Sequence, residues 1–412
     1  MSSMPRGGAF DKPLPEGVGL STLGVRGGLM RSGFEETSEA LYLTSSFVFA
    51  DAASAEAALA GDLDHFVYSR FRNPTVSMFE ERIRLIEGAE ACFATSSGMS
   101  AVFTALGALL GAGDRLVAAR GLFGSCFVVC NEILPRWGVE TVFVDGEDLD
   151  QWEAALSEPT TAVFFETPAN PMQSIVDVAR VSELAHAAGA TVVLDNVLAS
   201  PVLQRSLDLG ADVVVYSGTK HIDGQGRVLG GVILGSQEYI EGPVQKLMRN
   251  TGPGLSPFNA WVMVKGLETM PMRVRHCSAS ALRIAEFLEQ HPAVRWVRYP
   301  YLPSHPQYEL AKRQMSAGGT VVTFELVADD EAMAKKRAFA LLDALRVIDI
   351  SNNLGDTKSL ITHPATTTHR SMGPEGRAAA GITDGVVRIS VGLEDVEDLL
   401  SDLDQALSSC GA

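Results

Sequence analysis

The sequence predicts an α/β protein with a mostly parallel sheet in a large domain and a smaller α+β domain at the C-terminus. From about residue 91 to 235, short β-branched or aromatic runs alternate with helical patterns. Repeats of strand, helix and strand produce parallel sheets that are covered on both faces. From about residue 257 one long helical stretch follows, and shorter strands come after it. The length of 412 residues also favours two domains, because single cores stop growing below that size.

Three runs predict the clearest buried strands of the large domain. They are AVFFE (162–166), TVVLD (191–195) and DVVVY (212–216). Between the first two, residues 178–190 place apolar side chains at helical spacing, which predicts a connecting helix. The large domain is therefore expected to wind as strand, helix and strand.

Domain limits follow from these changes of pattern. Residues 1–65 alternate Gly/Pro-rich and short helical stretches, which predicts an N-terminal arm and a helix. Residues 66–260 are expected to form the large domain and residues 261–412 the smaller one. In the smaller domain, GTVVTFEL (319–326) and VVRISVG (386–392) predict strands.

The composition predicts a cytoplasmic protein. The sequence has 33 Lys and Arg against 50 Asp and Glu, a net charge of -17, which argues against a general nucleic-acid binder. The N-terminus does not resemble a signal peptide, and no run of 18 apolar residues predicts a membrane span. The five cysteines have no framework spacing, which fits a reducing compartment. We expect no metal site, and we expect Cys126 and Cys130 to face the core.

Polar residues follow the predicted strands where the chain leaves the sheet. One strand ends on Asp195, and another leads into Ser217-Gly218-Thr219-Lys220. The turn ETPANP (166–171) contains Asn170, and Ser97-Gly98-Met99 opens a helical pattern after the apolar run ACFAT. Because ligands bind at the carboxyl ends of parallel strands, we expect these groups to lie together.

Together these groups match what pyridoxal phosphate (PLP) requires. A lysine amine must form an imine with the cofactor, and Lys220 is available for it. A carboxylate must pair with the pyridinium nitrogen so that the ring accepts electrons, which suits Asp195. Alone, a lysine after a strand is more commonly a solvated loop residue and an aspartate there a turn or cap residue, so only their joint occurrence predicts the site. The phosphate needs several donors, which are offered by Gly98, Met99, Ser217 and Thr219.

The stretch DVVVYSGTKHIDGQGRVLGG (212–231) and the segment Tyr68-Ser69-Arg70, followed by Asn73-Pro74-Thr75, resemble the Cys/Met-metabolism family of fold-type I PLP enzymes. The resemblance covers about residues 22–392. It implies the PLP-dependent transferase fold type I, with a sheet of the seven-stranded type and the cofactor on Lys220. It also implies that Tyr68 and Arg70 reach the phosphate of a neighbouring subunit's cofactor. Dimers that share active sites are then expected, typically paired into a homotetramer in which the N-terminal arm contacts the neighbour.

The same resemblance implies roles for further residues. Ser97 is expected among the cofactor contacts, and Asn170 is expected to contact both the cofactor ring oxygen and the substrate. Phe123 falls where many relatives carry a ring-stacking Tyr, so the apolar face is kept and the phenol is lost. Arg388, in VRISVGLE (387–394), matches the residue that binds the substrate α-carboxylate, a task suited to a guanidinium. Tyr68 is implied as a substrate contact and a partner in proton transfer.

One loop indicates the branch of the family. Residues 353–365, NLGDTKSLITHPA, resemble the N-x-G-D-x-K-(S/T)-L pattern of the sulfhydrylases, with Asn353 as a substrate contact. The compact length favours the O-succinylhomoserine sulfhydrylases. These enzymes act on small molecules: they convert O-succinyl-L-homoserine and sulfide to L-homocysteine and succinate in methionine biosynthesis.

Other assignments remain open at this point. Within the family they are cystathionine γ-synthase, O-acetylhomoserine sulfhydrylase and, less closely, methionine or cystathionine γ-lyase. A nicotinamide-dependent oxidoreductase would need G-x-G-x-x-G directly after the first strand, and the sequence does not carry that motif there.

Overall fold

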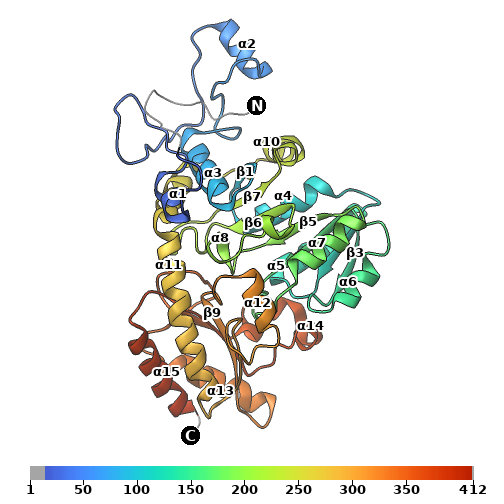
Figure 1. Cartoon of the computed structure of the whole chain (residues 1–412), viewed down its shortest axis with the longest axis vertical. Coiled ribbons are helices and arrows are strands. Elements are labelled where there is room, and N and C mark those ends of the chain that lie inside the picture. The colour runs from blue at the N-terminus through green and yellow to red at the C-terminus, as the bar shows by residue number, and fades with distance from the viewer. Residues whose placement is uncertain (1–13, 411–412) are drawn as a thin grey trace.

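The computed structural model describes residues 14–410, which form two sheets connected by one long helix (Figure 1). The larger sheet has seven strands in the order β1-β7-β6-β5-β4-β2-β3. All neighbours are parallel except β7, which runs antiparallel to β1 and β6. The mostly parallel sheet of the sequence prediction is confirmed. Its strands are β1 Ala91–Thr95, β2 Arg115–Ala119, β3 Glu140–Val144, β4 Ala162–Glu166, β5 Thr191–Asp195, β6 Val213–Ser217 and β7 Gly231–Gly235.

Helices cover both faces of the larger sheet. Successive strand residues face opposite ways, so Phe165 packs with α3 and α7 while Phe164 packs with α4 on the other face. Cys126 and Cys130 are buried on that second face and burial raises the pKa of both thiols, which confirms that they face the core. The helices that belong to this part of the chain are α3 Pro74–Glu87, α4 Gly98–Leu109, α5 Gly124–Val128, α6 Leu149–Ala155, α7 Val178–Ala187, α8 Ser200–Leu203, α9 Gln237–Tyr239 and α10 Gln245–Thr251.

The smaller sheet has the order β10-β11-β12-β9-β8 and is antiparallel except between β10 and β11. The long helix α11, Pro257–Gln290, packs against the larger sheet through residues such as Met263 and against the smaller one through residues such as Ile284. The domain limits near residues 66 and 261 stay a prediction. The other elements are β8 Val294–Arg298, α12 Tyr308–Gln314, β9 Val321–Leu326, α13 Glu331–Ala344, β10 Asp349–Ile350, β11 Leu360–Thr362, α14 Gly373–Ala379, β12 Val386–Ser390 and α15 Val396–Cys410.

Element boundaries differ from the prediction where local polar contacts or glycines intervene. The runs 162–166 and 191–195 coincide with β4 and β5. The strand predicted at 212–216 begins one residue later, because the Asp212 carboxylate accepts a hydrogen bond from the backbone of Val192 at 2.7 Å. The helix predicted to reach residue 190 ends at Ala187, since Gly189 adopts a φ of +80° that does not continue a helix.

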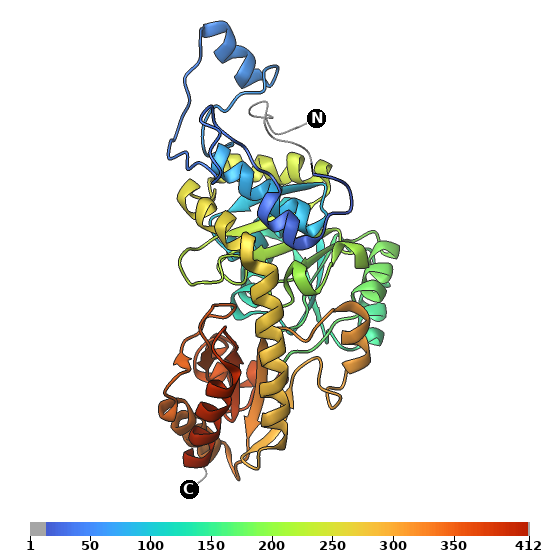
Figure 2. The same cartoon turned by 60° about the vertical axis from the view of Figure 1, so that its left-hand side comes forward.

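The N-terminal segment is an arm that leaves the body of the molecule. Helix α1, Leu20–Arg26, packs on α11, whereas α2, Ala52–Ala60, projects outward and buries none of its residues (Figures 1 and 2). Phe34 and Val48 of this arm are 93% and 90% exposed. Residues 1–13 of the predicted arm lie outside the described residues.

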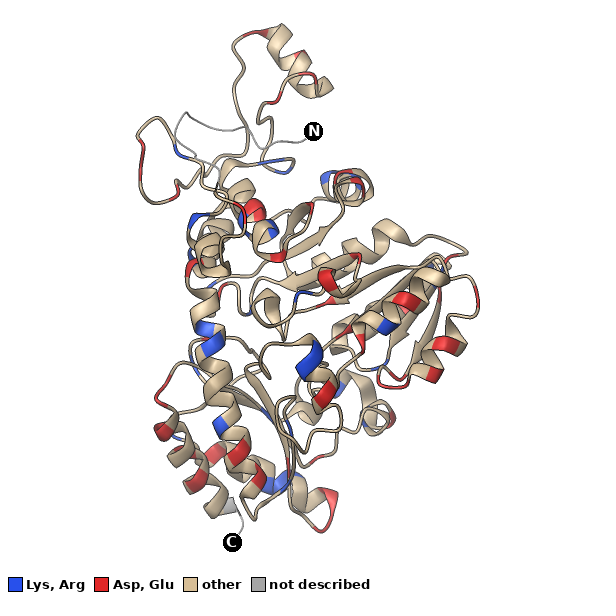
Figure 3. Ribbon diagram, in the orientation of Figure 1, with Lys and Arg blue, Asp and Glu red and all other residues tan. Residues whose placement is uncertain are grey.

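Charged residues gather on the outer helices, and the strands of both sheets carry few of them (Figure 3). This distribution follows from the cost of burying unpaired charge. Within residues 14–410, no helix is both long enough and apolar enough to cross a membrane. A charged side chain that is buried at the end of a strand therefore requires a specific explanation.

Candidate active site

The first turn of α4 lies against the end of β6. Ser97 caps the helix, with its hydroxyl accepting a hydrogen bond from the backbone N–H of Ser100 at 3.1 Å. A Cβ on Gly98 would lie 2.5 Å from Cβ of Ser217 and 2.9 Å from its Cα, so only glycine permits this approach. The exposed N–H groups of a helix start bind anions such as phosphate. The structure thus brings together Ser97, Gly98, Met99 and Ser217, four of the predicted cofactor contacts.

Lys220 lies on the turn after β6. Its Nζ donates a hydrogen bond to Oδ1 of Asn353 at 2.5 Å. Burial, with a smaller effect of the Arg388 charge, lowers the pKa of Lys220 to about 8. The neutral form, which a nucleophile or a base needs, is therefore much more populated near physiological pH than in an ordinary lysine, although it stays the minority. Thr219 exchanges hydrogen bonds with the backbone of Gly230 at 3.3–3.4 Å and lines the same pocket as Lys220.

Two buried carboxyl groups stand side by side at the carboxyl ends of β4 and β5. Glu166 and Asp195 are partners in the parallel register. Burial raises the pKa of both groups, and the neighbouring Asp195 charge raises that of Glu166 further. A cation placed beside Asp195 would lower this electrostatic cost. The pairing of Asp195 with a pyridinium nitrogen suits this environment and stays a prediction.

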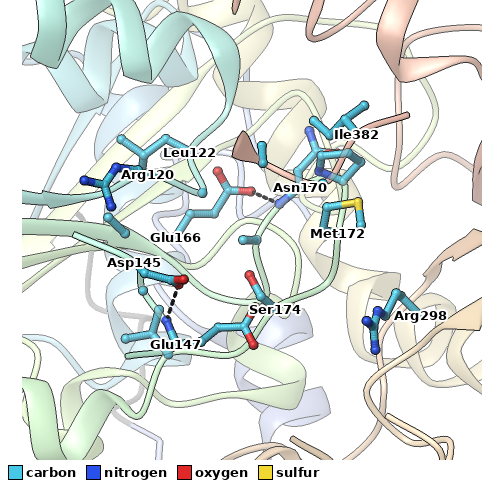
Figure 4. A pocket seen from close by; sticks show the side chains of 18 of the residues that line it. Arg120, Leu122, Asp145, Glu147, Glu166, Asn170, Met172, Ser174, Arg298 and Ile382 are labelled. Atoms are coloured by element: carbon cyan, nitrogen blue, oxygen red, sulfur yellow. Dashed lines mark hydrogen bonds between the residues drawn. The ribbon is translucent and has the colours of Figure 1, made fainter. Parts of the chain in front are cut away.

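Glu166 also holds two loops of the site. Its Oε2 accepts a hydrogen bond from the backbone N–H of Phe123 at 3.0 Å, and its Oε1 accepts one from Asn170 at 2.9 Å. Glu166 and Asn170 belong to the wall of a second cavity of about 470 Å³, between β4 and the segments around Arg298 and Ile382 (Figure 4). Glu166 was not among the predicted site residues, although its position at a strand end was a usable signal.

Arg388 is almost fully buried on β12. Its Nη1 donates to Oδ1 of Asn170 at 2.9 Å, and its Nη2 donates to the backbone oxygens of Asn352 and Asn353 at 2.9 and 3.2 Å. Among the described residues its Nε has no partner. Burial lowers the pKa of Arg388 to about 10, so the group stays charged at neutral pH. A buried guanidinium with an unused donor fits a carboxylate ligand.

Of these residues, Thr219, Lys220, Asn352 and Asn353 line an open pocket of about 550 Å³. Phe123, the predicted ring-stacking residue, lies in its wall together with Lys220 and Asn353. Next to the lysine, His221 uses both ring nitrogens, toward the Val197 carbonyl at 3.0 Å and the Thr320 hydroxyl at 2.9 Å. Burial lowers the pKa of His221 to about 4, so this residue is a neutral hydrogen-bonding group rather than a base.

Tyr68 and Arg70 do not line the pocket that contains Lys220. Tyr68 is 40% exposed in the segment that leads out of the arm. The guanidinium of Arg70 lies over the rings of Tyr68 and Phe71 and donates to the backbone oxygen of Arg249. Within the described residues neither side chain hydrogen-bonds to Lys220. Their assignment to a neighbouring subunit's site stays a prediction.

Comparison with known proteins decides the family. The model of the Cys/Met metabolism PLP-dependent enzymes matches residues 21–408. The chain belongs to this family. The fold-type I architecture and the PLP cofactor predicted from the sequence are confirmed.

Three similar proteins illustrate the range of the family. An O-succinylhomoserine sulfhydrylase of Mycobacterium tuberculosis is 75% identical, over 96% of this chain and 98% of that protein. An L-methionine gamma-lyase of Porphyromonas gingivalis is 40% identical, over 95% and 97%. Among solved structures, a cystathionine gamma synthase of Xanthomonas oryzae has a TM-score of 0.90 and 34% identity, over 96% of this chain and 99% of that one.

The lowered pKa of Lys220 predicts how the cofactor attaches. A protonated ammonium has no lone pair, so attachment of PLP to the apoprotein should speed up as pH rises through about 8 and then level off. An ordinary lysine would show this rise near 10.5. Absorbance after rapid mixing of apoprotein with PLP, followed across this pH range, measures the midpoint.

A variant checks the cause of that midpoint. Arg388→Met removes a nearby positive charge, so the pKa of Lys220 and the midpoint should both rise. A wild-type midpoint near 10.5 contradicts the assigned desolvation of Lys220, and an unchanged midpoint in the variant contradicts the contribution of Arg388.

Proposed function

We propose that this chain replaces the O-succinyl group of O-succinyl-L-homoserine by sulfide, giving L-homocysteine and succinate. The observation that carries this function is that Asn353 binds both the Lys220 amine through its side chain and Arg388 through its backbone oxygen. A base and a carboxylate-binding group beside one another suit chemistry at Cα of an amino acid. The choice of substrate follows the 75% identity to the sulfhydrylase of M. tuberculosis.

The cofactor contacts follow from the positions of the residues. Lys220 would hold PLP covalently, and Asp195 would pair with its ring nitrogen. The first turn of α4 at Gly98 would bind the phosphate, and Phe123 would cover a ring face. When bound, PLP supplies an electron sink that stabilises negative charge at Cα of the substrate.

The protein groups then bind the substrate and move its protons. Arg388 binds the α-carboxylate through Nε, which has no partner within the described part of the chain, and Asn170 keeps the guanidinium in place. Once the substrate amine has replaced Lys220 on the cofactor, the freed neutral amine of Lys220 takes the proton from Cα. It must pass this proton back to the bound substrate and cofactor before it can take a second proton, from Cβ, and the proton transfers run in reverse order after sulfide has replaced succinate at Cγ. A positioned base of this kind contributes about 10²–10⁴-fold to the rate.

Assays with paired substrates test this function. Purified enzyme with O-succinyl-L-homoserine should form homocysteine from sulfide with a kcat/KM about tenfold or more above that for cystathionine from L-cysteine. Lys220→Ala should abolish both reactions. Lys312→Ala, which removes a lysine beside Tyr308 on α12, is the matched control and should keep both.

Two outcomes would replace the proposed reaction with one of its relatives. Faster formation of cystathionine than of homocysteine identifies a γ-synthase. Rapid breakdown of L-methionine, with little use of acylhomoserine, identifies a γ-lyase.

We propose further that the enzyme assembles into dimers that share active sites and pair into a tetramer. The arm exposes large apolar side chains such as Phe34, Val48 and Leu43, and contiguous exposed apolar surface marks interaction sites. Tyr68 and Arg70 lie at the end of this arm and have no other assigned ligand. Arg70 would bind the phosphate of a neighbouring subunit's cofactor.

Complementation tests the sharing of sites. Lys220→Ala and Arg70→Ala should each inactivate the enzyme. Co-expressed, they should recover up to about a quarter of wild-type activity, because half of the dimers are mixed and one of their two sites is native. Activity no higher than that of the two variants alone would mean that each site is built from a single chain.

A further inference from the structure

The pocket around Lys220 contains a second positive charge that the proposed mechanism does not use. Ten residues line this pocket, and Lys220 and Arg227 are the ionisable ones among them. No carboxylate belongs to that lining. O-succinyl-L-homoserine carries two carboxylates, of which Arg388 accounts for one. The guanidinium of Arg227 therefore has no assigned ligand, and the second carboxylate of the substrate has no assigned partner.

Arg227 is held firmly at one side of its guanidinium. Its backbone N–H and its Nε donate to the two carboxylate oxygens of Asp223 at 2.7 and 2.8 Å, and its Nη2 donates to the Asp223 backbone oxygen at 3.2 Å. Asp223 is fully buried, whereas the Arg227 side chain is 36% exposed. The recorded hydrogen bonds of Arg227 within the described residues leave Nη1 free. The guanidinium is thus fixed in direction with one edge available.

The charge of Arg227 is not cancelled by its surroundings. Asp223 also interacts with the buried Arg273, so one carboxylate serves two guanidinium groups. Asp356, which lies against Gly226, is paired with Lys358 at 3.7 Å. Three cations against two carboxylates leave one positive charge, and Arg227 is the cation of the three that borders the pocket.

We propose that Arg227 binds the distal carboxylate of the O-succinyl group and thereby sets the preference for succinyl over acetyl esters. This inference rests on the proposed function. A guanidinium fixed on one edge loses little conformational freedom when its other edge binds a carboxylate. An acetyl ester has no carboxylate at that end and gains nothing from Arg227. Arg388 and Arg227 thus bind the two ends of one substrate. Arg227 and Lys220 line the pocket, and Arg388 donates to the backbone oxygens of Asn352 and Asn353 in its wall.

The test compares two substrates in one variant. In Arg227→Gln, kcat/KM for O-succinyl-L-homoserine with sulfide should fall about 10- to 100-fold relative to that for O-acetyl-L-homoserine, the range for a lost charge-assisted hydrogen bond. Arg227→Lys should recover part of the ratio, since it restores the charge without the planar fork. Arg313→Gln, which removes an arginine that is 66% exposed on α12, should leave the ratio unchanged.

A purely structural role for Arg227 gives a different result. Loss of the bonds to Asp223 would distort the loop after Lys220 and lower both values of kcat/KM by the same factor. An unchanged ratio in Arg227→Gln therefore overturns the proposal.

A binding measurement separates this proposal from the proposed function. Calorimetry of succinate binding to the holoenzyme should show a dissociation constant about tenfold or more higher in Arg227→Gln than in wild type, with acetate binding unaffected. Equal succinate binding in both proteins rejects the role of Arg227, whatever the reaction. A wild type that binds succinate through Arg227 but converts neither ester rejects the proposed function alone.

Discussion

The active site depends on a buried chain of hydrogen bonds that connects the two sheets. Lys220, after β6, donates to Asn353, whose backbone accepts from Arg388 on β12. Arg388 in turn donates to Asn170, and the backbone of Asn170 donates to Glu166 at the end of β4. Because the chain begins and ends on the larger sheet and passes through the smaller one, the lysine is positioned only when both sheets are packed together.

Burial of this chain explains its chemistry, because desolvation penalises every charge in it. It lowers the pKa of Lys220 and so supplies a neutral amine, while Arg388 remains charged with its pKa near 10. The same burial raises the pKa of Asp195 and Glu166. Among residues 14–410 the buried Nε of Arg388 has no hydrogen-bond partner. A cofactor and an amino-acid substrate would supply partners for these buried groups.

Sequence reasoning was most successful where a residue's role follows from local pattern. Continuous apolar runs located β4 and β5 to the residue, and the rule for parallel strand ends placed Asp195 and Lys220 at one edge. The role of Asn353 as a substrate contact was predicted only from the family resemblance, because 133 residues separate it from Lys220 in the sequence. Glu166 was missed because its contacts depend on strand register, and the role proposed for Arg227 was missed because it depends on a loop folded around Asp223. Roles assigned to Tyr68 and Arg70 depend on another subunit, which one chain does not contain.

The attachment of the cofactor to Lys220 is the point on which every other role depends. Reduction of the purified holoenzyme with borohydride makes that attachment permanent, and peptide mass spectrometry then locates it. The pyridoxyl phosphate mass should appear on the peptide that contains Lys220 and on no other lysine. Its appearance on a different lysine, or its absence from a holoenzyme that contains PLP, would contradict the assignment of Lys220 and with it the whole arrangement around Asn353.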